Sequence, residues 1–244
     1  ICVHNNLGSI VWENQYAGAT SADWINSLMQ AANGEIVAVG AIRSGLFHDG
    51  TFQRFNATNG NIIASFVYRR VRNEGFSGIV QVANGDFIIL GAEKDNNSGT
   101  AVNYNSTNIK LMRIDSTGNY LWERMYQNGG ILTGEHDGAI TLQGNELIVA
   151  GITNRLGTNP ASSGSNAGIQ VYMAGISLDG LTVNWTKLND INTANTANTQ
   201  IVRLVTDATS ATIGVSTNNR PFAGETASFS RNFLMASNTL DNTT

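Results

Sequence analysis

Two octapeptides decide the architecture of this chain: "NGEIVAVG" at residues 33–40 and "NGDFIILG" at residues 84–91. A looser third version, "GNELIVAG", occupies residues 144–151, and a degraded fourth, "TSATIGVS", occupies residues 209–216. In the first three, a Gly- or Asn-containing turn leads into a nearly continuous apolar run, which is typical of a strand buried on both faces. The recurrence predicts a repeat protein whose unit contains this strand.

Three further strands complete the unit. A weaker apolar run precedes each octapeptide and predicts a first strand, in "WINSLMQAA" from Trp24, "FSGIVQVA" from Phe76, "GAITLQ" from Gly138 and "IVRLVTD" from Ile201. A hairpin pattern follows and predicts the third and fourth strands, in "FNATNGNIIASFVY" from Phe55, "RIDSTGNYLWERMY" from Arg113 and "ISLDGLTVNWTKL" from Ile176. The opening "HNNLGSIVWENQY" matches the same hairpin, and the closing "NTLDNTT" matches its first half.

The residues in the hairpin turns give the period of the repeat. They are Gly8, Gly60, Gly118 and Gly180, with Asn242 in the fifth place, so the spacings are 52, 58, 62 and 62 residues. Gly and Asn supply the positive φ that tight hairpins require. A period of this size made only of strands indicates four-stranded sheets that pack on one another, because one such sheet cannot bury both of its faces alone.

These patterns predict an all-β protein, a β-propeller built of four-stranded antiparallel blades, with residues 1–244 as a single propeller domain or a propeller segment. "DWINSLMQAAN" at residues 23–33 is the one helix-like stretch, and its alignment with the next repeat favours a strand. The opening strand "SIVWENQY" could complete the last sheet and close a ring of four blades. Four is the lower limit for such rings, so we expect a segment of a larger propeller.

Composition narrows the classes of function. The chain has 41% hydrophobic and 13% charged residues, a formal net charge of -4 and a single cysteine. This acidic balance, with no run of Lys or Arg, argues against a nucleic-acid partner. No apolar stretch is long enough to span a bilayer, so we expect no membrane insertion. One cysteine also excludes an intramolecular disulfide.

Aromatic residues recur on the predicted fourth strand. Trp12, Trp122 and Trp185 occupy one repeated position, and the second copy has Ala64 there. We interpret the repeated Trp as a residue that packs between blades rather than as a platform for a sugar.

Taken together, the octapeptide and the hairpin with its Trp-x-x-x-Tyr strand resemble the degenerate propeller repeats of large secreted and surface proteins of Bacteroidota. The resemblance covers almost the whole chain. It implies a secreted or outer-surface location in a bacterium and a cargo of the type IX secretion route. Its motifs specify blades and imply no activity.

Candidate site residues are few. Glu135, His136 and Asp137 form the densest polar spot, "GEHDG", where a metal or acid/base role competes with that of a solvated loop. Glu93 and Asp95 lie in "EKDNNSG", which lacks the order of a recognised calcium loop but leaves a structural Ca²⁺ open. No catalytic residue and no metal site is predicted, and no other cofactor is expected.

A modification site is also weakly indicated. "DST" at residues 115–117 resembles a short O-glycosylation signal of exported Bacteroidota proteins, with Ser116 or Thr117 as the acceptor. An ordinary Asp-led turn is the alternative reading.

Three hypotheses follow from these features. We expect a non-enzymatic extracellular binding or display module within a larger secreted or cell-surface protein, with other subunits, further domains of the same chain or a surface glycan as partners. A glycan-active propeller enzyme with carboxylates at the mouth of its channel is the first rival. A structural spacer of an adhesin or filament is the second. Because fold does not imply function, this choice depends largely on analogy.

Overall fold

The computed structural model describes residues 1–16, 23–44, 47–69, 74–94, 107–126, 138–153, 170–190, 199–207, 210–217 and 232–239. Within these ranges every regular element is a β-strand, and the strands form five antiparallel sheets. The predicted all-β class is confirmed.

Three sheets are complete four-stranded meanders, and we call them the first, second and third blades. The first contains β3 (Trp24–Gln30), β4 (Ile36–Ser44), β5 (Phe47–Phe55) and β6 (Ile62–Tyr68). The second contains β7 (Glu74–Gln81), β8 (Phe87–Lys94), β9 (Thr107–Ile114) and β10 (Tyr120–Tyr126). The third contains β11 (Gly138–Gln143), β12 (Glu146–Thr153), β13 (Gln170–Ser177) and β14 (Val183–Asp190).

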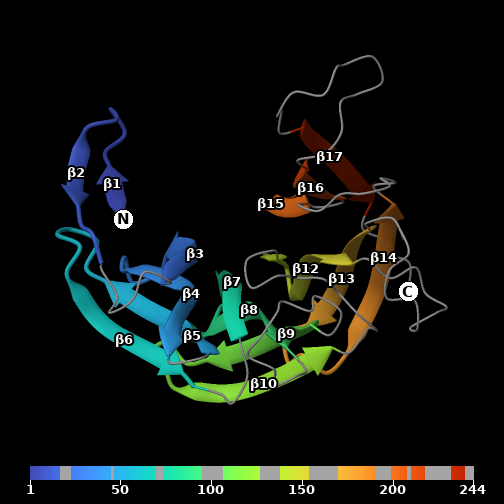
Figure 1. Ribbon diagram of the computed structural model, residues 1–244, viewed down its shortest axis with the longest axis horizontal. Coiled ribbons are helices and arrows are strands. Elements are labelled where there is room, and N and C mark those ends of the chain that lie inside the picture. The colour runs from blue at the N-terminus through green and yellow to red at the C-terminus, as the bar shows by residue number, and fades with distance from the viewer. Residues whose placement is uncertain are drawn as a thin grey trace.

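Two smaller sheets flank the three blades. β1 (Cys2–His4) and β2 (Ile10–Glu13) form a two-stranded sheet, and β15 (Thr199–Thr206), β16 (Ser210–Thr217) and β17 (Asn232–Thr239) form a three-stranded one. The five sheets follow one another along an arc, with β6, β10 and β14 on its convex side (Figure 1). Among the described strands, β1 and β2 pair only with each other, so the sheets form propeller blades in an open arc and not a closed ring of four.

Blades pack face to face through large apolar side chains. Between the first and second blades the rings of Phe52 and Phe87 lie 5.3 Å apart, and both side chains are buried with Phe76 and Met112. The continuous apolar runs of β4 and β8 supply residues to both faces of their sheets, as their sequences predict. Burial between blades is therefore the main source of stability of the array.

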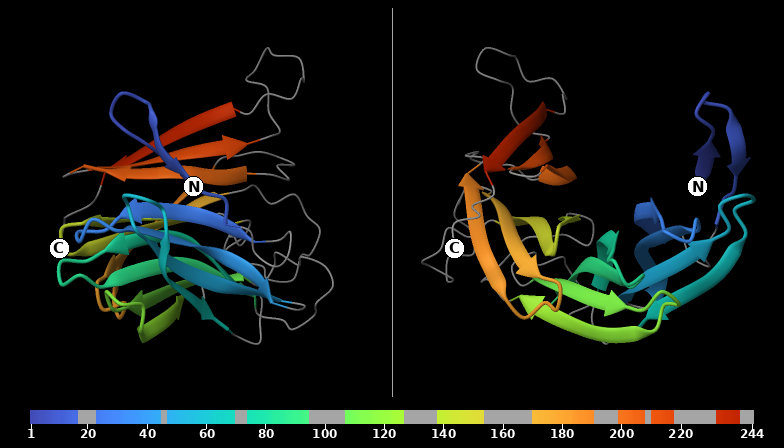
Figure 2. Two further views of the ribbon diagram at one scale, coloured as in Figure 1. Left: turned by 90° about the vertical axis from the view of Figure 1, so that its left-hand side faces the viewer. Right: turned by 180° about the vertical axis from the view of Figure 1, so that it is seen from behind.

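The two rims of the array differ. Turns between the first and second strands, and between the third and fourth strands, are short. They carry the seven glycines that have a positive φ among the described residues: Gly8, Gly34, Gly60, Gly85, Gly118, Gly144 and Gly180. We call their side the short-turn rim. The opposite strand ends, where second strands lead to third strands and one blade leads to the next, form the long-connection rim. Figure 2 shows the array from the side, with its strands running between the two rims.

Three tyrosines, on or just after the outer strands of successive sheets, bond to the turn of the following blade. The hydroxyl of Tyr68 donates to the carbonyl oxygen of Gly118 at 2.7 Å, and that of Tyr126 donates to Gly180 at 2.8 Å. Tyr16 makes the equivalent bond to Gly60. The predicted Trp-x-x-x-Tyr pattern is thus a repeated blade-to-blade contact, which we call the tyrosine latch.

An aromatic ring covers the same turn glycine. A Cβ on Gly60 would lie 2.7 Å from the Trp12 ring, and a Cβ on Gly180 would lie 3.0 Å from the Trp122 ring. The packing role predicted for the repeated Trp is therefore confirmed at both residues. In the second copy, where Ala64 replaces Trp, the Phe66 ring covers Gly118 instead.

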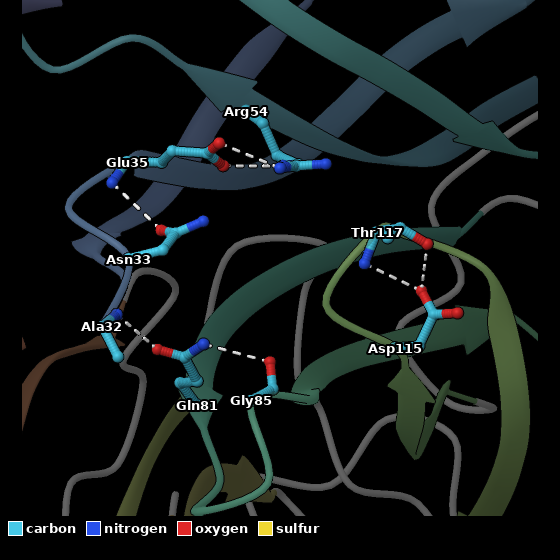
Figure 3. A network of polar contacts seen from close by, with 8 residues as sticks. All are labelled: Ala32, Asn33, Glu35, Arg54, Gln81, Gly85, Asp115 and Thr117. Atoms are coloured by element: carbon cyan, nitrogen blue, oxygen red, sulfur yellow. Dashed lines mark hydrogen bonds and ion pairs between the residues drawn. The ribbon is translucent and has the colours of Figure 1, made fainter.

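Polar contacts connect the blades along the short-turn rim (Figure 3). The side-chain oxygen of Gln81 accepts a hydrogen bond from the backbone N–H of Ala32 at 2.7 Å, and its amide group donates to Gly85 at 3.0 Å. Within the first blade, Arg54 binds both carboxylate oxygens of Glu35, at 2.7 and 2.9 Å. These contacts fix the turns of the first and second blades relative to one another along the short-turn rim.

Candidate functional site

Buried charge is found at the opposite side, near the long-connection rim. Four polar side chains are buried among the described residues: Asp49, Thr51, Glu74 and Lys110. Asp49 and Thr51 lie on β5, Glu74 begins β7, and Lys110 lies near the start of β9. Asp49, Glu74 and Lys110 therefore occupy the halves of their strands nearer the long-connection rim, and Thr51 lies at the middle of β5.

Lys110 is the centre of an ion cluster in the second blade. Its side chain is only 1% exposed, and its ammonium nitrogen lies 2.5 Å from a carboxylate oxygen of Glu74, which is fully buried. Glu123 and Glu93 approach the same nitrogen at 3.3 and 3.7 Å. One buried cation thus faces three carboxylates, brought together from the four strands of a single sheet.

Strand alternation directs this cluster toward the first blade. Lys110 shares a face of β9 with Met112, which packs in the core between the first and second blades. Removing the positive charge would leave the buried carboxylate of Glu74 without its closest counter-charge, which is costly in a low-dielectric interior. We read Lys110 and Glu74 as a fixed pair that holds the rim, while Glu93 and Glu123, at 12% and 27% exposure, extend the negative charge toward solvent.

The first blade places a second polar group at the same rim. The Asp23 carboxylate accepts a hydrogen bond from the backbone N–H of Arg43 at 3.0 Å. The Trp24 ring meets the His48 ring edge-on, with centroids 4.8 Å apart. Arg43 is exposed, and the other three side chains are partly exposed. Aromatic, basic and acidic groups are therefore all offered at the surface of this rim.

Strand register relates the acidic residues of the two blades. Ile25 pairs with Gly40 and Phe76 pairs with Gly91, so Asp23 and Glu74, each two residues earlier, hold equivalent places. In the third blade Gly138 pairs with Gly151, and the residue two positions before it in the sequence is His136. The register therefore establishes the equivalence for Asp23 and Glu74 only.

The structure describes only one of the residues predicted as binding candidates. Glu93 lies in the ion cluster, 3.7 Å from the Lys110 nitrogen. Asp95, Glu135, His136 and Asp137 lie outside the described residues, as does the fifth turn residue Asn242.

Ser116 and Thr117, the predicted modification residues, lie at the short-turn rim in the turn between β9 and β10. Both are exposed, but the Thr117 hydroxyl donates to the Asp115 carboxylate at 2.7 Å. Hydrogen bonds from the side chains of Thr117 and Asn119 hold the pKa of Asp115 well below its usual range. Ser116 and Thr117 are thus part of an Asp-led turn, in which the Thr117 hydroxyl is already hydrogen-bonded.

Lys110 and Glu74 were not predicted. The available signal was a lysine on the same alternating face as Met112 and Ile114 in "IKLMRI" at residues 109–114. A charge at an inward-facing strand position needs a buried partner, but the sequence does not say which acid supplies it, because Glu74 lies 36 residues away.

The described residues contain no group of three or more His, Cys, Asp or Glu side chains arranged to hold a metal ion. They also contain no helix with the length and apolar character needed to cross a membrane.

Comparisons with known proteins were made for sequence and for structure. No family model and no curated protein sequence matches the chain. Among solved structures, an acylaminoacyl peptidase from Pyrococcus horikoshii is similar over 89% of this chain, with a TM-score of 0.43 and 12% identity. This chain covers only 32% of that peptidase.

Two variants of a levansucrase from B. megaterium are similar over 96% of this chain and 72% of theirs, with a TM-score of 0.46 and 8% identity. Similarity at this level transfers no activity and no site residue to this chain.

Proposed function

We propose that this chain is a non-enzymatic binding or display module of a larger secreted or cell-surface protein, and that its ligand contacts the long-connection rim. The observation that carries the proposal is the separation of the two rims. Short glycine turns, latched by tyrosines, occupy one rim, and the described polar clusters of the first and second blades occupy the other. A rigid scaffold with its longer connections on one side is the arrangement that binding proteins commonly use.

The connections between strands also differ in length between the two rims. β8 ends at Lys94 and β9 begins at Thr107, while β12 ends at Thr153 and β13 begins at Gln170, so the longest connections within blades join strand ends at the long-connection rim. Long connections on a compact domain are more often functional than incidental. These two connections thus leave the blades on the side where the buried ion cluster is found.

Location and partners follow from the sequence features and the resemblance described above. A surface rich in Asn, Thr, Ser and Gly, with little charge, suits an extracellular protein of a bacterium exported by the type IX route. The expected partners are other protein subunits, further domains of the same polypeptide or a surface glycan. The open arc supports membership in a larger assembly, because its flanking sheets are not joined to each other.

A binding screen with rim-specific variants tests the proposal. Purified protein is passed over immobilised bacterial and host polysaccharides and over surface proteins. A variant with residues 95–106 replaced by a short Asn-Gly turn is compared with Thr58→Lys, on the short-turn rim. We expect the loop variant to lose at least tenfold in affinity for any captured ligand and the control to retain it. Equal affinity in both variants would place the ligand elsewhere.

One observation favours an enzymatic alternative: three glutamates, from β7, β8 and β10 of the second blade, approach the ammonium group of Lys110. A glycan-active enzyme needs carboxylates that can exchange protons with substrate. Glu74 is instead buried against Lys110, which favours the binding role. Release of reducing sugar ends from any bound polysaccharide, abolished by Glu123→Gln, would decide for the enzyme.

A further inference from the structure

The three latched turns share one arrangement. Gly60, Gly118 and Gly180 have φ values of 74°, 102° and 70° and are buried. Each lies beneath an aromatic ring of the preceding sheet, and each carbonyl oxygen accepts a hydrogen bond from a tyrosine of that sheet. The turn and the outer strand that covers it thus form a repeated interface.

The turn between β1 and β2 has the same backbone conformation as these three turns. Gly8 has a φ of 80°, and its N–H donates to the Asn5 carbonyl oxygen at 3.0 Å, as the Gly118 N–H donates to Asp115. The Asn5 side-chain oxygen accepts hydrogen bonds from Leu7 and Ser9, both at 3.0 Å. This turn is therefore preformed in the geometry of the three latched turns.

Gly8 differs from the other three in what surrounds it. It is exposed, and a Cβ built on it would meet nothing within 4 Å. Its carbonyl oxygen is hydrogen-bonded by His4 Nδ1 at 2.9 Å, from within the same hairpin, where a tyrosine of another sheet serves the equivalent oxygens. A carbonyl oxygen has a second lone pair, so this bond leaves room for a tyrosine hydroxyl.

From this series we infer that the Gly8 turn is a docking site for one more propeller blade, whose outer strand carries an aromatic residue and a tyrosine four residues later. This inference deepens the proposed role within a larger assembly and rests on it. The occupant follows from continuity: the same interface occurs three times in the array, and the β1–β2 turn is the next member of that series. The tyrosine hydroxyl would bond to the Gly8 carbonyl, and the aromatic ring would cover the glycine.

The full chain with one added blade tests the inference. A copy of residues 74–172 is joined directly ahead of Ile1, so that Gly8 follows the copied segment at the spacing that Gly180 has in the natural sequence. The copied β11 and β12 then extend the β1–β2 sheet, and the copied Trp122 and Tyr126 fall opposite Gly8. Gly8→Ala and Gly118→Ala are introduced separately into the natural and the extended chain.

In the natural chain we expect Gly8→Ala to lower the unfolding midpoint less than Gly118→Ala does. Both substitutions strain a positive-φ position, but only the second also meets an aromatic ring. In the extended chain we expect the two substitutions to have equal effects. A matched control carries Trp122→Ala and Tyr126→Phe in the copied segment only, and should return Gly8→Ala to its milder effect.

Two results would overturn the inference. One is an effect of Gly8→Ala that is the same in the natural and the extended chain. The other is rapid amide exchange throughout the copied segment, which would show that the blade does not dock. Neither measurement involves the long-connection rim, so a ligand screen that failed there would leave this result unchanged.

Discussion

At the residue scale, Lys110 is the side chain whose loss we expect to be most damaging. Lys110→Met should lower the free energy of unfolding by about 3–5 kcal/mol, because the buried Glu74 carboxylate loses its counter-charge. Chemical denaturation of the purified variant measures this loss. The matched ion pair is Arg54–Glu35, whose side chains are 17% and 21% exposed, and Arg54→Met should cost only about 1 kcal/mol.

The double variant Lys110→Met with Glu74→Leu separates charge from packing. Replacing both members of a buried pair by apolar residues is often close to neutral. We therefore expect it to recover most of the lost stability. A double variant as unstable as Lys110→Met alone would contradict the assignment of the loss to an uncompensated charge.

Tyr126 gives the tyrosine latch a measurable pH dependence. Burial raises the pKa of Tyr126 from 10.0 to about 12, so the folded state holds the phenol proton more tightly than the unfolded state. The contribution is fully present below pH 10 and is lost as the pH rises from 10 to about 12. Denaturation between pH 8 and 12 should show this loss in the natural protein and a flatter profile in Tyr126→Phe.

The same substitution removes one hydrogen bond, so Tyr126→Phe should also cost about 1 kcal/mol at neutral pH. Tyr120→Phe, on the exposed part of the same strand, is the control and should leave both stability and pH profile unchanged. Indistinguishable profiles for the two variants would remove Tyr126 from the latch.

At the scale of elements, β3 and β4 depend on a glycine at an irregular register. The pairing of the two strands shifts between Ile25 and Ser27, and Gly40 pairs with Ile25 at that shift. A Cβ on Gly40 would overlap the backbone carbonyl of Trp24, which cannot move without breaking the sheet. The same shift recurs in β7, between Phe76 and Gly78.

Gly40→Ala should therefore destabilise the first blade by more than 3 kcal/mol, roughly the cost of a severe core defect. Gly34→Ala, in the turn of the same hairpin, faces open space and should cost only about 1 kcal/mol for its positive φ. Thermal unfolding of the two variants makes the comparison. If Gly40→Ala were the milder of the two, the close approach of β3 and β4 would be wrong.

At the scale of the whole molecule, the sheets form a nearest-neighbour series. The second blade packs against a complete blade on each side, through two separate cores. The β1–β2 sheet and the β15–β17 sheet flank the array and contain fewer strands. In such arrays stability is distributed among the interfaces between neighbours.

We expect amide hydrogen exchange to be slowest in β8 and β9 and fastest in β1, β2 and β17, by at least a hundredfold in protection. Exchange followed by mass spectrometry of peptides resolves these strands. Uniform protection across all five sheets would mean that the array unfolds as one cooperative unit, contrary to this expectation.

Local patterns were sufficient for the strands and turns but not for the site. β11 begins at Gly138, where its apolar run begins, and the hairpin glycines Gly8, Gly60, Gly118 and Gly180 all have the positive φ that the turn pattern requires. These features depend on residues near one another in the chain. The Lys110–Glu74 pair was missed because the order of the strands in the blade decides which acid reaches a buried lysine, and Glu74 lies on β7, one strand beyond the neighbour of β9.

The sequence by itself determined the repeat, the four-strand unit and the positions of the tight turns, because hydrophobic alternation and glycine conformation act over a few residues. Only the tertiary structure decided which side chains meet across blades, as Tyr68 does with Gly118 and as Phe66 does over the same glycine in the copy that has Ala64 in place of Trp. It also decided which side chains meet across the strands of one blade, as Lys110 does with Glu74. It also decided that the described sheets form an open arc and leave Gly8 exposed. The reason is that contacts between blades depend on packing angle and register, which no local pattern encodes.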